Sequence, residues 1–211
     1  MRKVLAALGF LATSAPGHAD VAGAFDYYVL ALSWSPTWCE IEGAARGSTQ
    51  CDADADFGWI VHGLWPQHAR GYPQYCTTRH RDPSRSETAA MADIMGTASL
   101  AWYQWQKHGR CAAMDPQAYF EAARDAFDRV VKPEAFRQLD VPVRLPAHAV
   151  EDAFLADNPS LFPDAVTITC RDGRIQEARI CLTRDDLSPR ACGADVVRDC
   201  AATDALMPPI P

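Results

Sequence analysis

Apolar runs along the chain predict several short β-strands. Aromatic and β-branched residues dominate positions 25–35, and a second run of this kind covers 57–62. Two further runs, 166–170 and 175–182, flank the turn sequence Arg171-Asp172-Gly173, and this arrangement predicts a β-hairpin. A hairpin pairs its two strands antiparallel, so we expect an antiparallel sheet.

A longer apolar repeat predicts helices in the middle of the chain. Residues 87–107 are expected to be helical, with an interruption near Gly96. Asp115-Pro116 predicts the start of another helix, because aspartate caps the first turn and proline fits its first position. The apolar face of that helix consists of Tyr119, Phe120, Ala123, Phe127 and Val130. A short helix at Pro133 and another at 147–156 complete the prediction.

The remaining stretches are rich in glycine, proline and polar residues. Residues 40–56 and 66–84 are predicted to be loops, and the proline-rich tail after Cys200 is predicted to lack regular structure. The run 57–62 breaks at once into glycine and proline, which places His62 where a strand ends and a loop begins. Strands and helices are interspersed, so the predicted fold class is α+β: one domain with a central antiparallel sheet, flanking helices and disulfide bonds.

The first 19 residues have the pattern of a secretory signal peptide. Arg2 and Lys3 precede a short apolar core and small residues that end at Ala19, so we expect cleavage after Ala19. The apolar core is too short to span a bilayer. The rest of the chain, 20–211, is long enough for one substantial core. We therefore expect a secreted or periplasmic protein with no membrane association.

The charge of the mature chain limits its partners. Residues 1–19 hold two of the 20 basic residues and none of the 27 acidic ones, so 18 basic and 27 acidic side chains give residues 20–211 a net charge of −9. Non-specific nucleic-acid binders derive most of their affinity from lysine and arginine at phosphates. The composition argues against such a binder, and any polyanionic substrate must bind at a small, locally positive cleft.

All eight cysteines lie in the mature chain. An even number behind a signal peptide is typical of four disulfides, and the absence of a Cys-x-x-Cys spacing argues against zinc or thioredoxin-like chemistry. The sequence does not fix the connectivity. The pairing that we expect is Cys39–Cys51, Cys76–Cys111, Cys170–Cys200 and Cys181–Cys192. The second pair would tie the loop after 57–62 to the segment around His108.

Two histidine-containing stretches carry the candidate chemistry. The first, 57–67, surrounds His62. In the second, 102–111, the side chains of Gln104, Lys107 and His108 share one helical face at i, i+3 and i+4. Two histidines, a lysine and an amide that meet in one cleft indicate general acid–base chemistry on a phosphate ester.

Cleavage of RNA has requirements that these side chains meet. The 2′-hydroxyl is a nucleophile within the substrate, so the enzyme needs a base for its proton, an acid for the departing 5′-oxygen and positive charge at the phosphate. Histidine has an ordinary pKa of about 6.5, so one neutral and one protonated histidine can move both protons. The lysine supplies the charge, and no metal or other cofactor is required.

With these motifs in place, the sequence resembles the ribonuclease T2 family of secreted acid ribonucleases. The resemblance rests on His62-Gly63-Leu64-Trp65-Pro66 and on Trp105-Gln106-Lys107-His108-Gly109-Arg110-Cys111. The run 25–34, with a proline and a cysteine soon after it, is similar to the first strand of that family, and the C-terminal hairpin with its cysteines also fits. The resemblance covers roughly residues 25–200.

The resemblance implies a role for each matching residue. His62 corresponds to the general acid toward the leaving oxygen, and His108 to the base that activates the 2′-hydroxyl. The two roles exchange when water opens the 2′,3′-cyclic phosphate. Lys107 corresponds to the lysine that stabilises the charged transition state, and Trp65 to an aromatic residue that helps to hold a base, a contact that tolerates every base. Further aromatic side chains assigned to substrate binding are Tyr72 and Tyr103, with Tyr75 as the alternative to Tyr72.

The chain departs from the family pattern at two neighbouring positions. The family usually has glutamate three residues before the lysine, where this chain has Gln104, and many members have histidine where this chain has Tyr103. Glutamine can donate a hydrogen bond to a phosphate oxygen, but it cannot carry charge, pass a proton or raise the pKa of a nearby histidine. Either Gln104 orients the phosphate and activity survives, or much of the rate is lost. We favour the first, because both histidines and Lys107 remain.

Three functions follow from these patterns. The first is a monomeric, metal-independent endoribonuclease of low base specificity that acts on single-stranded RNA and not on DNA. The second is an RNA-binding or protein-interaction protein that keeps the fold without useful catalysis, as Gln104 and the acidic composition suggest. The third is a metal-dependent phosphatase or hydrolase that uses His62, which loss of activity with a chelator would support.

Overall fold

The computed structural model of the chain describes residues 20–211. The predicted signal peptide, 1–19, lies outside the described residues. Among the helices of 20–211, none combines the length and the apolar character needed to cross a membrane.

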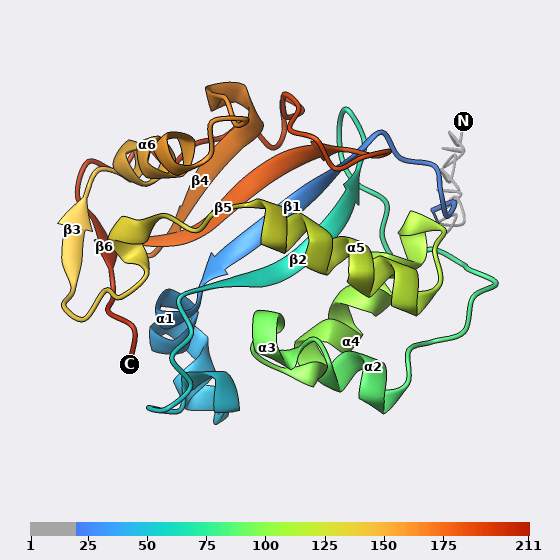
Figure 1. The fold of residues 1–211 in the computed structure, drawn as a ribbon, viewed down its shortest axis with the longest axis horizontal. Helices are drawn as coiled ribbons and strands as arrows, with labels where there is room; N and C mark the ends of the chain where they lie inside the picture. The colour runs from blue at the N-terminus through green and yellow to red at the C-terminus, as the bar shows by residue number, and fades with distance from the viewer. Residues whose placement is uncertain (1–19) are drawn as a thin grey trace, which may run out of the picture.

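In the described part of the chain, a six-stranded sheet has the order β2-β1-β5-β6-β3, with β4 also paired to β5 (Figure 1). These strands pair antiparallel, except for one parallel pairing between β5 and β6. The strands are β1 (Tyr27–Trp34), β2 (Trp59–Gln67), β3 (Val143–Leu145), β4 (Val166–Arg171), β5 (Arg174–Thr183) and β6 (Ala205–Met207). The predicted N-terminal strands and the predicted hairpin are present, and the α+β fold class is confirmed.

Helices lie against this sheet. Within 20–211 they are α1 (Ser35–Trp38), α2 (Arg85–Ala89), α3 (Ala92–Met95), α4 (Ala98–Lys107), α5 (Pro116–Arg129) and α6 (Ala147–Asp157). Gly96 follows α3 with φ +78°, a conformation that suits glycine, and so produces the predicted interruption. Asp115 caps α5 as predicted, because its carboxylate accepts the N–H of Ala118 at 2.9 Å.

The two faces of the sheet have different roles. The even-numbered residues 28–34 of β1 are buried in the main core, and α5, which crosses β1 and β2 in Figure 1, packs against them. Tyr27 and Val29 face the other way and form a smaller cluster with residues of β5 and the C-terminal segment. We call this second side of the sheet the site face. It is defined by Val29 and Ser33 of β1 and by Glu177 and Arg179 of β5.

A β-bulge sets the direction of His62. Val61 and Gly63 pair with consecutive residues of β1, which leaves His62 between them as the extra residue. Val61 and Leu64 are both buried in the main core although they are three positions apart, which strict alternation does not allow. The bulge therefore lets core residues on both sides of it face inward while His62 and Trp65 project from the site face.

The structure corrects three parts of the predicted layout. β2 continues to Gln67, so His62 lies inside a strand rather than at its end; Pro66 is accommodated because β2 is an edge strand. Residues 39–51, predicted mostly as loop, form short π- and 3₁₀-helical turns between the two cysteines that end the segment. The tail after Cys200 contains β6, which is paired with β3 from a distant part of the chain.

The expected disulfide pairing is confirmed for all eight cysteines, which lie within 20–211. The bonds are Cys39–Cys51, Cys76–Cys111, Cys170–Cys200 and Cys181–Cys192. Cys76–Cys111 ties the loop 68–84 to the turn after α4, and beside it the N–H of Tyr75 donates to the carbonyl of Lys107 at 2.8 Å. The loop that carries Tyr72 is thereby held against the end of α4.

Candidate active site

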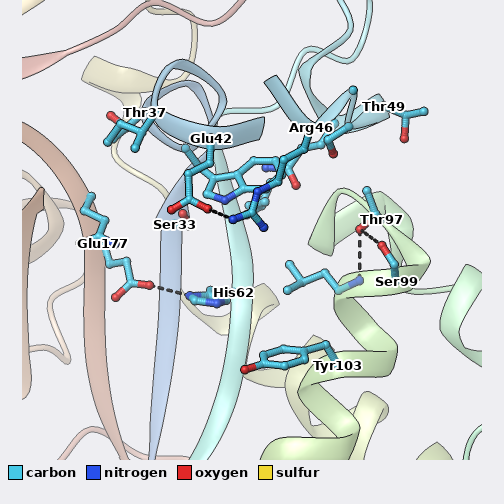
Figure 2. A pocket seen from close by; sticks show the side chains of 18 of the residues that line it. Ser33, Thr37, Glu42, Arg46, Thr49, His62, Thr97, Ser99, Tyr103 and Glu177 are labelled. Carbon is cyan, nitrogen blue, oxygen red and sulfur yellow. Dashed lines mark hydrogen bonds and ion pairs between the residues drawn. The ribbon is translucent and has the colours of Figure 1, made fainter. Parts of the chain in front are cut away.

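Two adjoining cavities open beside the site face. The larger has a volume of about 920 Å³ and is lined by β1, the turns after α1 and the start of α4. The smaller has a volume of about 440 Å³ and is lined by β2, the loop after it and the end of α4. His62 and Tyr103 line both. Figure 2 shows His62 in the larger cavity, between Glu177 on one side and Tyr103 on the other.

The smaller cavity brings together the residues that the sequence predicts for catalysis or substrate binding, with Tyr72 and not its alternative Tyr75 in the lining. These residues are His62, Trp65, Tyr72, Tyr103, Gln104, Lys107 and His108. They come from a strand, a loop and a helix, so three segments that are separate in the sequence meet in one place. The rest of the lining is Val29, Gln67, Arg179, Asp195 and Val196.

His62 has a buried carboxylate as its partner. Its Nδ1 lies 2.6 Å from Oε1 of Glu177, whose side chain is 3% exposed, whereas the side chain of His62 is 37% exposed. Burial raises the pKa of Glu177, but the hydrogen bond to His62 and the charges of His62 and Arg179 outweigh it, and the net pKa is lowered. Glu177 is therefore an ionised acceptor, so Nδ1 of His62 donates to it and Nε2 is left for the cavity.

His108 has the opposite environment. It follows the last turn of α4, is 4% exposed, and its Nδ1 is buried with no hydrogen-bond partner among the described residues. Burial, together with the positive charges of Lys107 and His62, lowers the pKa of His108 to about 3. His108 is therefore a neutral imidazole at any pH well above that value, while His62 has a carboxylate beside it.

Trp65 lies between the two histidines. Its ring stacks on His108, with centroids 5.3 Å apart and planes at 28°, and meets the ring of His62 edge-on at 5.2 Å. Its Nε1–H donates to Oε1 of Gln104 at 2.8 Å, and Gln104 is buried. The amide oxygen is thus engaged by the indole, which leaves the NH₂ group for a substrate oxygen. A Cβ at Gly63 would collide with both Oε1 of Gln104 and Nε1 of Trp65, so only glycine fits there.

Positive charge and exposed aromatic rings line the smaller cavity. The Nζ of Lys107 lies 5.8 Å from the ring centre of Tyr72 and 6.0 Å from that of Tyr103. The guanidinium of Arg179 lies 5.5 Å from the ring centre of Trp65. Tyr72 and Tyr103 are each 46% exposed. The cavity therefore offers cations for an anionic group and aromatic faces for flat rings.

Glu177 and Arg179 are absent from the sequence prediction. Glu177 lies 115 positions from His62, so no local motif connects them. The available signal is their spacing: they share one face of the predicted strand 175–182, and Ala178 and Ile180 of the same strand are buried in the main core on the other face. A charged pair at i and i+2, on the face opposite the buried Ala178 and Ile180, indicates a polar site on that face.

The arrangement defines a class of site. Within residues 20–211, no group of three or more histidine, cysteine, aspartate or glutamate side chains is placed to hold a metal ion. The cavity combines a neutral imidazole, a second imidazole with a carboxylate partner, and the cations of Lys107 and Arg179 in its lining. Two titratable groups in opposite environments can act as a general acid and a general base, and the cations beside them suit an anionic group.

Comparison with known proteins identifies the family. The family model described as the ribonuclease T2 family matches residues 25–192, most of the described domain. The chain belongs to the ribonuclease T2 family.

Individual relatives agree with this assignment. A ribonuclease of Aeromonas hydrophila is 38% identical over 129 residues, 59% of this chain and 57% of the relative. Trichomaglin, described as an S-like ribonuclease, has the same fold with a TM-score of 0.71 at 23% identity, covering 89% of this chain and 99% of that one. RNase NT, solved in complex with 5′-AMP, has a TM-score of 0.66 at 20% identity, covering 88% of this chain and 98% of that one. The chain spans about half the length of the curated relatives it matches.

Proposed function

We propose that this chain is a metal-independent endoribonuclease that cleaves single-stranded RNA through a 2′,3′-cyclic phosphate to 3′-phosphate ends. The observation that carries the proposal is the pair of histidines with opposite environments in one cavity. Membership of the ribonuclease T2 family supports RNA as the substrate. The cations and aromatic rings of the same cavity support binding of a nucleotide beside a phosphate.

The first step is an internal transfer of the phosphoryl group. His108, which is neutral, takes the proton of the 2′-hydroxyl as the O2′–P bond forms. The P–O5′ bond breaks, and the departing O5′ takes the proton held on Nε2 of His62. The products are a 2′,3′-cyclic phosphate and a free 5′-hydroxyl, with His62 neutral and His108 protonated.

The second step is the reverse arrangement with water. His62, now neutral, takes a proton from water as the new O–P bond forms, and His108 returns its proton to O2′ as the P–O2′ bond breaks. The product is a 3′-phosphate, and both histidines regain their starting states. The same two side chains serve both steps, because each finishes the first step in the form that the second requires.

The charge that builds on the phosphate needs donors that are already in place. Lys107 provides a positive charge, and the NH₂ group of Gln104 provides a neutral donor whose direction is fixed by the bond to Trp65. Glutamine thus retains a positioning function at this place. Trp65 and Tyr72 are proposed to stack on a base, which predicts low base specificity, and DNA is not a substrate because it lacks the 2′-hydroxyl.

We further propose that residues 1–19 are removed after Ala19 and that the mature domain works as a monomer in the periplasm or outside the cell. The four disulfides of residues 20–211 support an oxidising compartment, because such bonds are rare in the cytosol. The N-terminal sequence and mass of the protein recovered from the periplasmic and culture fractions test this, with Asp20 expected as the first residue.

A single ribodinucleotide tests the proposed chemistry. Purified mature protein in EDTA should convert it first to the 2′,3′-cyclic phosphate and then to the 3′-phosphate, both followed by ³¹P NMR. The matched control is the same dinucleotide with hydrogen in place of the attacking 2′-hydroxyl, which should stay intact. Cleavage of this deoxy control, or a requirement for an added divalent metal, would contradict the proposal.

A further inference from the structure

We propose that Glu177, held by Arg179, is a positioning residue for His62 and makes it the general acid of the site; this inference rests on the proposed ribonuclease function. Position 104 of α4, which lines the same cavity, is a glutamine and carries no negative charge. The carboxylate that contacts a catalytic imidazole comes instead from strand β5, where Glu177 lies against His62.

The position of Glu177 is fixed by the sheet. It lies in β5, where it pairs with Ser33 of β1 on one side and with Thr169 of β4 on the other. A residue between two hydrogen-bonded neighbours has little freedom of backbone movement. The bulge in β2 turns His62 toward the same face, and the two side chains meet there at 2.6 Å. Two strands of one rigid sheet thus set the contact.

Both carboxylate oxygens of Glu177 have charged partners. Oε1 accepts from Nδ1 of His62, and Oε2 accepts from Nε and Nη2 of Arg179 at 2.9 and 2.7 Å. Burying a carboxylate is costly unless it is paired in this way. Arg179 lies two residues along the same strand and is itself 31% exposed, so it compensates the buried charge without being buried fully. Arg179 therefore holds Oε2, and Oε1 accepts from His62.

This contact does for His62 two things that no group does for His108. It fixes the ring so that Nε2 points into the cavity, and it places a negative charge where a protonated imidazole is stabilised. The Nδ1 of His108 has no such partner within 20–211, and the positive charge of Lys107 disfavours the protonated form of this ring. Glu177 thus supplies the His62 side of the difference between the two histidines, and burial supplies the His108 side; together they assign the acid to His62 and the base to His108.

Substrates with different leaving groups distinguish a positioning role of Glu177 from a merely structural one. In RNA the departing alkoxide needs a proton, whereas in a nucleoside 3′-(4-nitrophenyl phosphate) the nitrophenolate leaves without one. Glu177→Gln keeps the shape of the side chain and removes its charge. It should lower kcat on a ribodinucleotide about 10- to 100-fold and change the rate on the nitrophenyl ester by less than about threefold.

Both substrates are assayed on one preparation, so the ratio of the two rates does not depend on how much of the variant is folded. Glu177→Gln leaves Arg179 without its carboxylate partner. The double variant Glu177→Gln/Arg179→Gln removes this cation too and should show the same change in the ratio of the two rates. The matched control is Asp93→Asn, which removes a carboxylate from another arginine pair, with Arg124 at 2.8 Å, outside both cavities. It should leave both rates unchanged.

The outcomes separate this inference from the proposed function. An equal loss on both substrates means that Glu177 is structural, and no loss on either means that His62 does not need it; each overturns the inference while the ribonuclease function stands. A wild-type protein that cleaves neither substrate overturns the proposed function itself. His108→Ala should lower both rates, because the base is needed whatever the leaving group.

Discussion

Replacing His108 with phenylalanine should make the stability of the protein less dependent on pH, because this side chain destabilises the native state in acid. Phenylalanine keeps a flat ring against Trp65 but cannot titrate. The pKa of His108 is lowered from 6.5 to about 3 in the native state. Between these values the unfolded chain binds a proton that the native protein does not, so stability present above pH 6.5 is lost as the pH falls toward 3. Each pH unit below 6.5 lowers the free energy of unfolding by about 1.4 kcal/mol, so about 2 kcal/mol of stability is lost by pH 5.

Urea unfolding of the wild type and of His108→Phe at pH values from 7.5 down to 4.5 measures this directly. Between pH 7 and pH 5 the wild type should lose about 2 kcal/mol more of its unfolding free energy than His108→Phe loses. His108→Gln is the control, because it lacks a titrating group but has a different shape; it should show the same slope. A difference that stays constant with pH for both variants would refute the assignment of His108 as a buried, neutral imidazole.

Three other substitutions test how the cavity is built. Gly63→Ala should push apart the Trp65–Gln104 contact, lowering stability by about 1–3 kcal/mol in thermal unfolding and lowering activity with it; an active, equally stable variant would contradict the packing. Replacing both Cys76 and Cys111 with alanine should cost about 4 kcal/mol in urea unfolding, because this bond closes a loop with a sequence separation of 35. Gln104→Glu keeps the acceptor for the indole N–H but removes the NH₂ donor, so kcat should fall by about tenfold; a gain of more than tenfold would mean that the glutamine has cost the enzyme most of its rate.

Local signals carried much of the fold. The apolar run that became β1 and the aspartate–proline start of α5 were predictable because each depends on neighbouring residues only. The end of β2 was not, because its extension to Gln67 depends on pairing with β1 and on a bulge that no local pattern marks. The same applies to β6, whose three residues form a strand only because β3 lies beside them.

The candidate site divides in the same way. Residues within the two motifs, such as His62 and His108, could be predicted, because each motif is continuous in the sequence. Glu177 could not, because it reaches His62 across the sheet. Its contribution also changes how Gln104 is understood: the sequence shows a missing carboxylate, while the structure shows another one in contact with the opposite histidine.

Cleavage of RNA in EDTA by the wild type and by His62→Ala tests the central claim most directly. His148→Ala is the control, because His148 is an exposed residue of α6 outside both cavities. We expect the wild type and His148→Ala to cut RNA to cyclic phosphate ends, and His62→Ala to be slower by about 10²-fold or more. A wild type that leaves RNA intact from about pH 4 to 8, a range that brackets the ordinary histidine pKa, while Gln104→Glu cuts it, would contradict the account. The natural protein would then have the ribonuclease fold without catalytic activity.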